Sequence, residues 1–73
     1  MEFSIEYCGV WDYYPNAASL ADYLKKEYNT EPKLIESSGG VFEVKANGQL
    51  IFSKKQLGRF PDHDELKTSI DSL

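Results

Sequence analysis

The fold is decided by residues 2–28, which read EFSIEYCGVWDYYPNAASLADYLKKEY. At the start of this stretch, the apolar side chains of Phe3, Ile5 and Tyr7 alternate with polar ones, which is the pattern of a strand with one buried face. Further along, apolar residues recur at the spacing of a helix. Because another strand candidate follows, we predict a β-α-β unit, which should be right-handed with its two strands parallel.

The helix is predicted to cover residues 13–28. Asp12 is expected to cap its N-terminus, Pro15 suits the first turn because a missing N–H costs nothing there, and Asn29 is predicted to end it. Its apolar stripe consists of Tyr13, Ala17, Leu20, Leu24 and Tyr28.

The middle of the chain predicts a strand over residues 33–37 and a hairpin over residues 41–46 and 49–53. The hairpin turn is Asn47-Gly48, a pair typical of a type I′ turn. The register of a two-residue turn places Val44 opposite Ile51 and Phe42 opposite Ser53. The other face of the hairpin is then expected to carry Glu43, Lys45, Leu50 and Phe52.

The end of the chain predicts a loop over residues 54–61, followed by a helix. Asp62 and Glu65 have the spacing of a capping box at the start of this helix. Its apolar stripe consists of Leu66, Ile70 and Leu73. The element order is therefore β-α-β-β-β-α.

These elements predict one α/β domain, residues 1–73, with a two-layer α+β arrangement. Because Glu2, Ser4 and Glu6 line one face of the first strand, a helix on that face would bury charges. We therefore expect a four-stranded mixed sheet with both helices on one face and the other face open. The core is expected to contain Phe3, Ile5, Leu20, Leu24, Val44, Ile51, Leu66 and Ile70.

Composition narrows the classes of function. The chain has 73 residues, which suffice for one small core, and a net charge of −4, which argues against nonspecific binding to nucleic acid or anionic membranes. We find no apolar run near the ~18 residues of a membrane span and no basic start typical of a signal peptide, so we expect a cytoplasmic protein. One Cys and one His exclude an internal disulfide and a four-ligand zinc site, and no metal is expected.

The residues best suited to a reaction lie between the first strand and the helix, at Tyr7-Cys8-Gly9-Val10-Trp11. A thiol just before a helix lies near the positive end of the helix dipole and near free N–H groups, which favours the thiolate. Cys8 is therefore our candidate redox nucleophile. The competing interpretation is a small buried hydrophobic residue, because free Cys is often buried.

Two further segments accompany this Cys: residues 40–55, with the hairpin, and Gly58-Arg59-Phe60-Pro61 before an acidic helix start. Together with Cys8 they resemble the selenoprotein W-like (Rdx) family, which includes relatives of selenoproteins T and H. The resemblance covers nearly the whole chain. It implies a thioredoxin-like β-α-β-β-β-α fold and thiol-based redox chemistry linked to glutathione, without a tightly bound cofactor.

The chain departs from the family motif, C-x-x-C or C-x-x-U with U for selenocysteine. It reads Cys8-Gly9-Val10-Trp11, so Trp11 stands where the second Cys or selenocysteine should be. Natural divergence, an engineered replacement and a misread UGA codon, one base from the Trp codon UGG, all stay open as its origin. Trp11 either shields Cys8 or contacts a partner, or it simply packs over the loop.

The candidate binding residues are Gly9, Val10, Gly39, Gly40, Lys54, Lys55 and Phe60. The paired glycines before the hairpin permit a close approach of backbone. The two lysines are either solvated or dock a glutathione carboxylate or an acidic partner. Phe60 is either a lid on the core or an exposed anchor.

Two functions follow from these residues. In the first, the chain is a monothiol oxidoreductase in which Cys8 forms a mixed disulfide with glutathione or a protein, and an external thiol resolves it. In the second, it is a non-enzymatic interaction module that binds a protein through the Phe60 loop or the open sheet face, either as a monomer or as a weak homodimer. That face is expected to be lined by Glu6, Glu43, Lys45, Leu50 and Phe52.

Overall fold

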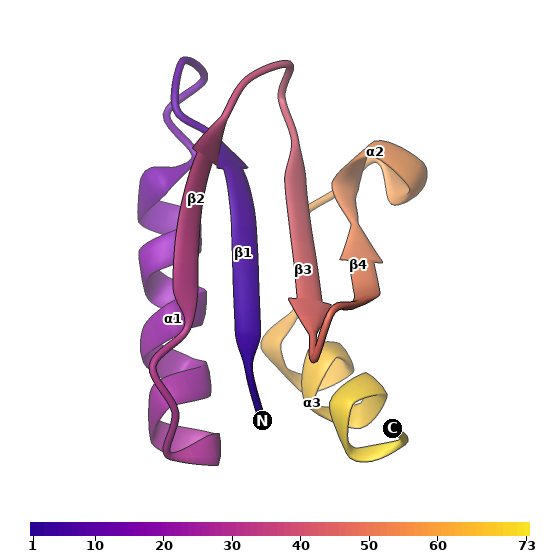
Figure 1. Ribbon diagram of the computed structural model, residues 1–73. Helices are drawn as coiled ribbons and strands as arrows, with labels where there is room; N and C mark the ends of the chain where they lie inside the picture. The colour runs from indigo at the N-terminus through magenta and orange to yellow at the C-terminus, as the bar shows by residue number, and fades with distance from the viewer.

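The computed structural model describes residues 1–73 and shows a four-stranded sheet with its helices packed on one side (Figure 1). The strands lie in the order β2-β1-β3-β4. β1 is parallel to β2 and antiparallel to β3, and β3 is antiparallel to β4. The mixed sheet and the parallel β-α-β unit are therefore as predicted. The strands are β1 (Phe3–Cys8), β2 (Lys33–Ser37), β3 (Phe42–Ala46) and β4 (Gln49–Ser53).

The two long helices, α1 (Tyr14–Tyr28) and α3 (His63–Asp71), both lie behind the sheet in Figure 1, which confirms the two-layer arrangement. A short helix, α2 (Lys54–Leu57), corrects the prediction of a loop after β4. The hydroxyl of Ser53 accepts a hydrogen bond from the N–H of Gln56 at 3.4 Å, which caps this single turn. Four residues are too few for an apolar period, so sequence spacing gave no sign of α2.

Helix α1 begins differently from the prediction, because Asp12 does not cap it. The N-cap residue is Tyr13, whose side chain makes no capping hydrogen bond, and Asp12 lies in the preceding loop with a φ of 60°. Pro15 occupies the first turn as expected, and Asn29 ends the helix in the left-handed conformation.

The hairpin has the predicted turn but a different register. Asn47 and Gly48 both have positive φ, 52° and 81°, as a type I′ turn requires. A bulge then makes Ile51 an extra residue, so that Val44 pairs with Phe52 instead of Ile51. The bulge also moves Ser53 opposite Glu43 instead of Phe42.

The shifted register moves two side chains relative to the prediction, because each residue step changes the face of a strand. Phe52 lies in the core with 4% of its surface exposed, whereas Ile51 is only half-buried. Every other predicted core residue is buried. The core also contains Tyr7, Cys8, Ala17, Phe42 and Ala46.

The capping box at the start of α3 is confirmed. The Asp62 carboxylate accepts from the N–H of Asp64 at 3.1 Å, and the Glu65 carboxylate accepts from the N–H of Asp62 at 2.9 Å. Arg59 donates to the same carboxylate of Glu65, at 2.9 Å from its second nitrogen. The bonds from Arg59 and Asp62 lower the pKa of Glu65 from 4.5 to about 2. This arrangement anchors the loop that carries Phe60.

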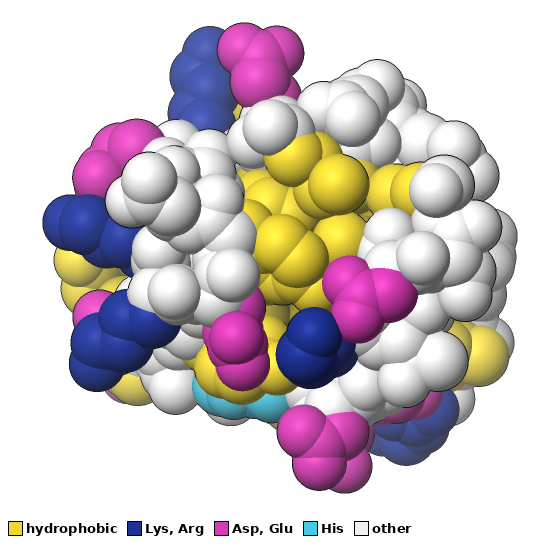
Figure 2. Space-filling view, turned by 90° about the horizontal axis from the view of Figure 1, so that it is seen from below, with side chains coloured by type: hydrophobic (Ala, Val, Ile, Leu, Met, Phe, Trp, Pro, Cys, Tyr) yellow, Lys and Arg dark blue, Asp and Glu magenta, His cyan; other side chains and the backbone are white.

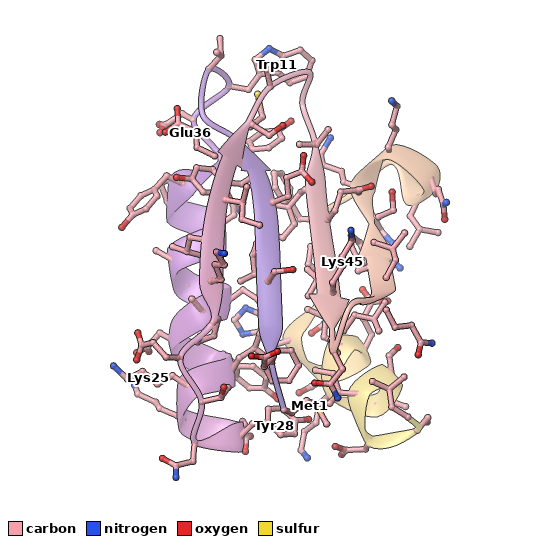
Figure 3. All side chains as sticks on the ribbon, in the orientation of Figure 1. Met1, Trp11, Lys25, Tyr28, Glu36 and Lys45 are labelled. Atoms are coloured by element: carbon pink, nitrogen blue, oxygen red, sulfur yellow. The ribbon has the colours of Figure 1, made fainter.

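Figure 2 shows the end of the molecule that lies opposite Trp11. At the end opposite Trp11, hydrophobic side chains occupy the centre of the surface, with charged side chains around them (Figures 2 and 3). Met1 and Leu73 are each 53% exposed. None of the helices has the length and apolar character that a membrane crossing needs.

Candidate functional site

Cys8 is the last residue of β1 and is completely buried. Its N–H donates to the carbonyl of Val41 at 2.9 Å, which ties it to the segment before β3. The N–H of Trp11 lies 3.4 Å from the Cys8 sulfur and donates to it. Helix α1 begins only at Tyr14, so this donor to the sulfur comes from the intervening loop, not from the helix as the sequence suggested.

The loop after Cys8 is held as a tight turn by its own backbone. The N–H of Tyr13 donates to the carbonyl of Cys8, and the N–H of Asp12 donates to that of Gly9, both at 3.1 Å. Gly9 also donates to the carbonyl of Ser37 at 3.1 Å. Val10, at the tip, is 81% exposed. These bonds hold the turn at one end of the sheet, and Cys8 lies beneath it.

Trp11 lies across this end of the sheet (Figure 3). A Cβ atom added to Gly40 would come within 2.6 Å of the indole, so the ring rests directly on the Gly40 backbone. Gly40 has a φ of 72°, a conformation that L side chains rarely adopt. The indole is nevertheless 60% exposed, so one side of it packs and the other faces solvent. Gly39 has a similar φ of 78°, but a Cβ atom added there would meet nothing within 4 Å.

A carboxylate borders the other side of the loop and was missed by the sequence analysis. The Glu36 side chain occupies the space where a Cβ of Gly9 would lie, so any larger residue at position 9 would displace it. Burial raises the pKa of Tyr7, and the nearby Glu36 and Tyr14 raise it further, so the Tyr7 phenol is neutral at pH 7. Pairing of β2 with β1 sets Glu36 opposite Tyr7, a register that the sequence alone did not specify.

An aromatic cluster continues from Trp11 toward α3. Trp11 meets Tyr13 edge-on at 6.2 Å between ring centroids, and Tyr13 meets Phe60 at 4.8 Å. Phe60 also packs against Phe42 of the core at 5.2 Å and is half-buried, so it serves as a lid on the core. The ammonium of Lys54 lies 5.4 Å from the ring centroids of both Tyr13 and Phe60.

The structure thus brings most of the predicted site residues to one end of the sheet. Cys8, Gly9, Trp11, Gly40, Lys54 and Phe60 are linked there by direct contacts or through shared neighbours. Lys55 is exposed and has no ring contact. No three His, Cys, Asp or Glu side chains lie close enough together to hold a metal ion.

The open sheet face is the second surface of interest. Glu6 of β1 pairs directly with Glu43 of β3, and one carboxylate oxygen of Glu43 is buried without a hydrogen-bond partner. Ile35 and Leu50 are 40% and 42% exposed. Phe52, predicted to lie on this face, is in the core because of the bulge in β4.

The fold and the position of Cys8 at the end of β1 define a protein of the thioredoxin-like class. Comparison with known proteins then narrows the assignment: the model of the Rdx family matches residues 2–72, so the chain belongs to the Rdx family. This confirms the resemblance to selenoprotein W-like proteins, a group generally associated with thiol redox chemistry.

Solved structures agree with this assignment. A selenoprotein W-related protein from Vibrio cholerae superimposes with a TM-score of 0.90 at 30% identity, over 97% of this chain and 92% of that one. A protein from Bordetella parapertussis gives a TM-score of 0.90 at 29% identity, over 99% and 96% of the two chains.

Relatives identified by their sequences extend the comparison. The mouse protein named migration and invasion enhancer 1 is 36% identical over 69 residues, which are 90% of this chain and 58% of that protein. The chain therefore spans little more than half the length of this relative. A SelT-like protein from Arabidopsis thaliana is 54% identical over 33 residues, covering 45% of this chain and 16% of that one.

Proposed function

We propose that the chain is a single-thiol redox protein in which Cys8 is the nucleophile. The observation that supports this most directly is the hydrogen bond from the Trp11 N–H to the Cys8 sulfur, which places the sulfur against the loop that corresponds to the C-x-x-C motif of the family. The family's association with thiol redox chemistry supports the same role.

The reaction is a thiol–disulfide exchange. The Cys8 thiolate attacks one sulfur of a disulfide, a new bond forms between the two sulfurs, and the other sulfur leaves as a thiolate. Because Cys8 is the only Cys, the mixed disulfide persists until an external thiol attacks it. Glutathione suits both roles as a co-substrate, no tightly bound cofactor is required, and a reducing compartment such as the cytoplasm fits this use of a free thiol.

The loop has to open for this reaction, because Cys8 is fully buried when Trp11 rests on Gly40. The contact between the indole and Gly40 involves packing alone, and 60% of the indole already faces solvent. We infer that Trp11 acts as a lid on the thiol, and that the fraction of molecules with the lid open sets the rate of Cys8 modification.

Replacing Gly40 by Ala is expected to speed the reaction of Cys8 with N-ethylmaleimide in the folded protein. The added methyl group would displace the indole, and overpacking of this kind costs about 1–3 kcal/mol. If that cost falls on the closed state, the open population rises roughly 5- to 150-fold. The measurement is the rate of mass gain in the intact protein.

Gly39→Ala is the matched control, since Gly39 has a similar positive φ but open space around it. It carries the same backbone strain and should leave the rate near that of the parent chain. Trp11→Ala removes the lid without a strained backbone and should be fast as well. Equal rates for Gly40→Ala, Trp11→Ala and the parent chain would rule out the lid.

A second candidate function is protein binding through the open sheet face. The exposed Ile35 and Leu50, together with the unpartnered oxygen of Glu43, favour it. Only these two large apolar side chains are exposed on this face, so we propose a monomer or a weak homodimer as the corresponding state in solution. This function takes precedence if Cys8 proves unreactive in the folded protein.

A further inference from the structure

The open sheet face carries charged side chains that have no partner within the chain. Figure 3 views the sheet from this side and shows Lys45 projecting from β3. The ion pairs of the chain all involve other residues, and four charged side chains of this face are left unpaired: Lys33, Lys45, Glu6 and Glu43. Two cations and two anions therefore remain available on one surface.

These side chains form two rows across the strands. Ser4 of β1 pairs with Lys33 on one side and with Lys45 on the other, which gives a cationic row. Two residues further along β1, and therefore on the same face, Glu6 pairs with Glu43 and gives an anionic row. Residues two apart on a strand are separated by about 7 Å, so the two rows lie side by side.

The anionic row lacks a cation. Like charges directly opposite each other on neighbouring strands destabilise a sheet, and Glu6 and Glu43 are in that relation. One carboxylate oxygen of Glu43 is also buried without a hydrogen-bond partner, which costs free energy unless a donor is supplied. Both observations indicate that a cation from outside the chain would stabilise this row.

The pattern of charges is complementary to itself. A two-fold axis that runs between the two rows, parallel to them, places the cationic row of one copy over the anionic row of a second copy. Lys45 then faces Glu43 of the second copy, and the symmetry makes this contact twice. Stacked sheets lie about 10 Å apart, a separation that a Lys and a Glu side chain span together. Ile35 and Leu50, which are 40% and 42% exposed, flank the charges on the two outer strands of the sheet.

We propose that the chain forms a homodimer through its open sheet face, with Lys45 of each copy paired to Glu43 of the other. This inference rests on the second candidate function, binding through that face, and names the partner. It does not depend on the reactivity of Cys8. Because only two large apolar side chains accompany the charges, the dimer should dissociate on dilution.

Sedimentation velocity at increasing protein concentration tests the dimer. The parent chain should shift from 8.3 kDa toward twice that mass. Lys45→Glu sets a carboxylate against Glu43 of the second copy at two symmetric places, and should raise the dissociation constant at least roughly tenfold. Lys55→Glu makes the same change of charge at an exposed site on α2, away from this face, and should leave the constant unchanged.

An exchange of charges identifies the pair. Glu43→Lys alone should also weaken the dimer, because an ammonium then faces an ammonium. A mixture of Lys45→Glu and Glu43→Lys should associate again, since every carboxylate of this contact then faces an ammonium. Circular dichroism checks that each variant is folded, and Lys33→Glu with Glu6→Lys provides a second pair if Glu43→Lys is not.

The outcomes separate this inference from the proposed functions. A parent chain that stays at 8.3 kDa up to about 1 mM would overturn the second copy as the partner. A dimer that Lys45→Glu leaves intact would overturn the arrangement and would count against the open face itself. Uptake of glutathione by Cys8 is measured on the same samples: a dimer with an inert Cys8 would support this inference and refute the redox proposal.

Discussion

Replacing Trp11 by Cys is expected to change the product of oxidation from a stable glutathione adduct to an internal disulfide. The backbone N of Trp11 already lies 3.4 Å from the Cys8 sulfur, so a side chain at position 11 starts within reach of it. Once Cys8 carries glutathione, the new thiolate would attack the Cys8 sulfur, and reduced glutathione would leave. Intact-protein mass would show the glutathione group on the parent chain and its absence from Trp11→Cys.

Conversion of the glutathione adduct to the internal disulfide should be close to complete. The internal thiol acts at a high effective concentration, whereas an external thiol must first diffuse to the adduct. Trp11→Ala separates loss of the indole from gain of a thiol: it should take up glutathione faster than the parent chain and keep it. A persistent glutathione adduct on Trp11→Cys under the same conditions would show that the two positions do not meet.

Truncating Leu24 to Ala is expected to remove much of the stability of the domain. Leu24 lies on α1 and is completely buried against the sheet. Leu→Ala changes at such sites cost about 2–5 kcal/mol, while a domain holds only about 5–15 kcal/mol in total. The melting temperature should fall by at least about 8 °C, since 1 kcal/mol corresponds to about 4–8 °C at this size. Thermal unfolding followed by circular dichroism measures this.

Leu57→Ala makes the same chemical change at a side chain that is 55% exposed. It should alter the stability by no more than about 0.5 kcal/mol. Equal melting temperatures for Leu24→Ala and Leu57→Ala would mean that the packing of α1 on the sheet is not as described.

Much of the fold could be predicted from local patterns. The alternation of Phe3, Ile5 and Tyr7 fixed both the strand and the side of the sheet that helices cover. The Asn47-Gly48 turn and the Asp62 capping box were readable because each depends on a few adjacent residues.

The features that were predicted wrongly, the register of β4 and the cap of α1, depend on contacts that local sequence patterns do not encode. A bulge at Ile51 shifts one residue between faces, and only the packing of Phe52 into the core selects it. Asp12 was a reasonable cap by residue type, but the loop over Cys8 requires it to adopt a positive φ.

The position of Cys8 at the end of β1, with Trp11 in the loop that follows, could be predicted from the sequence, but the surroundings of these two residues could not. The spacing of the motif indicates the two positions. Three other features depend on tertiary structure: the contact of the indole with Gly40, the packing of Glu36 on Gly9, and the ring contacts that Lys54 makes and Lys55 does not. From the sequence, a buried Cys8 and a reactive Cys8 are alternatives. The lid that we propose makes burial and reactivity compatible, because the Cys8 thiol would then be inaccessible only while Trp11 rests on Gly40.

Intact-protein mass after exposure to oxidised glutathione shows directly whether Cys8 reacts as a thiol in the folded chain. Native and denatured protein are compared, with Cys8→Ser as the blank. We expect one glutathione group on the native chain, removed by reduced glutathione in excess, and none on Cys8→Ser. A native chain that takes up no glutathione, while the denatured chain does, would show that the thiol is buried and inert and that Cys8 is not a redox nucleophile.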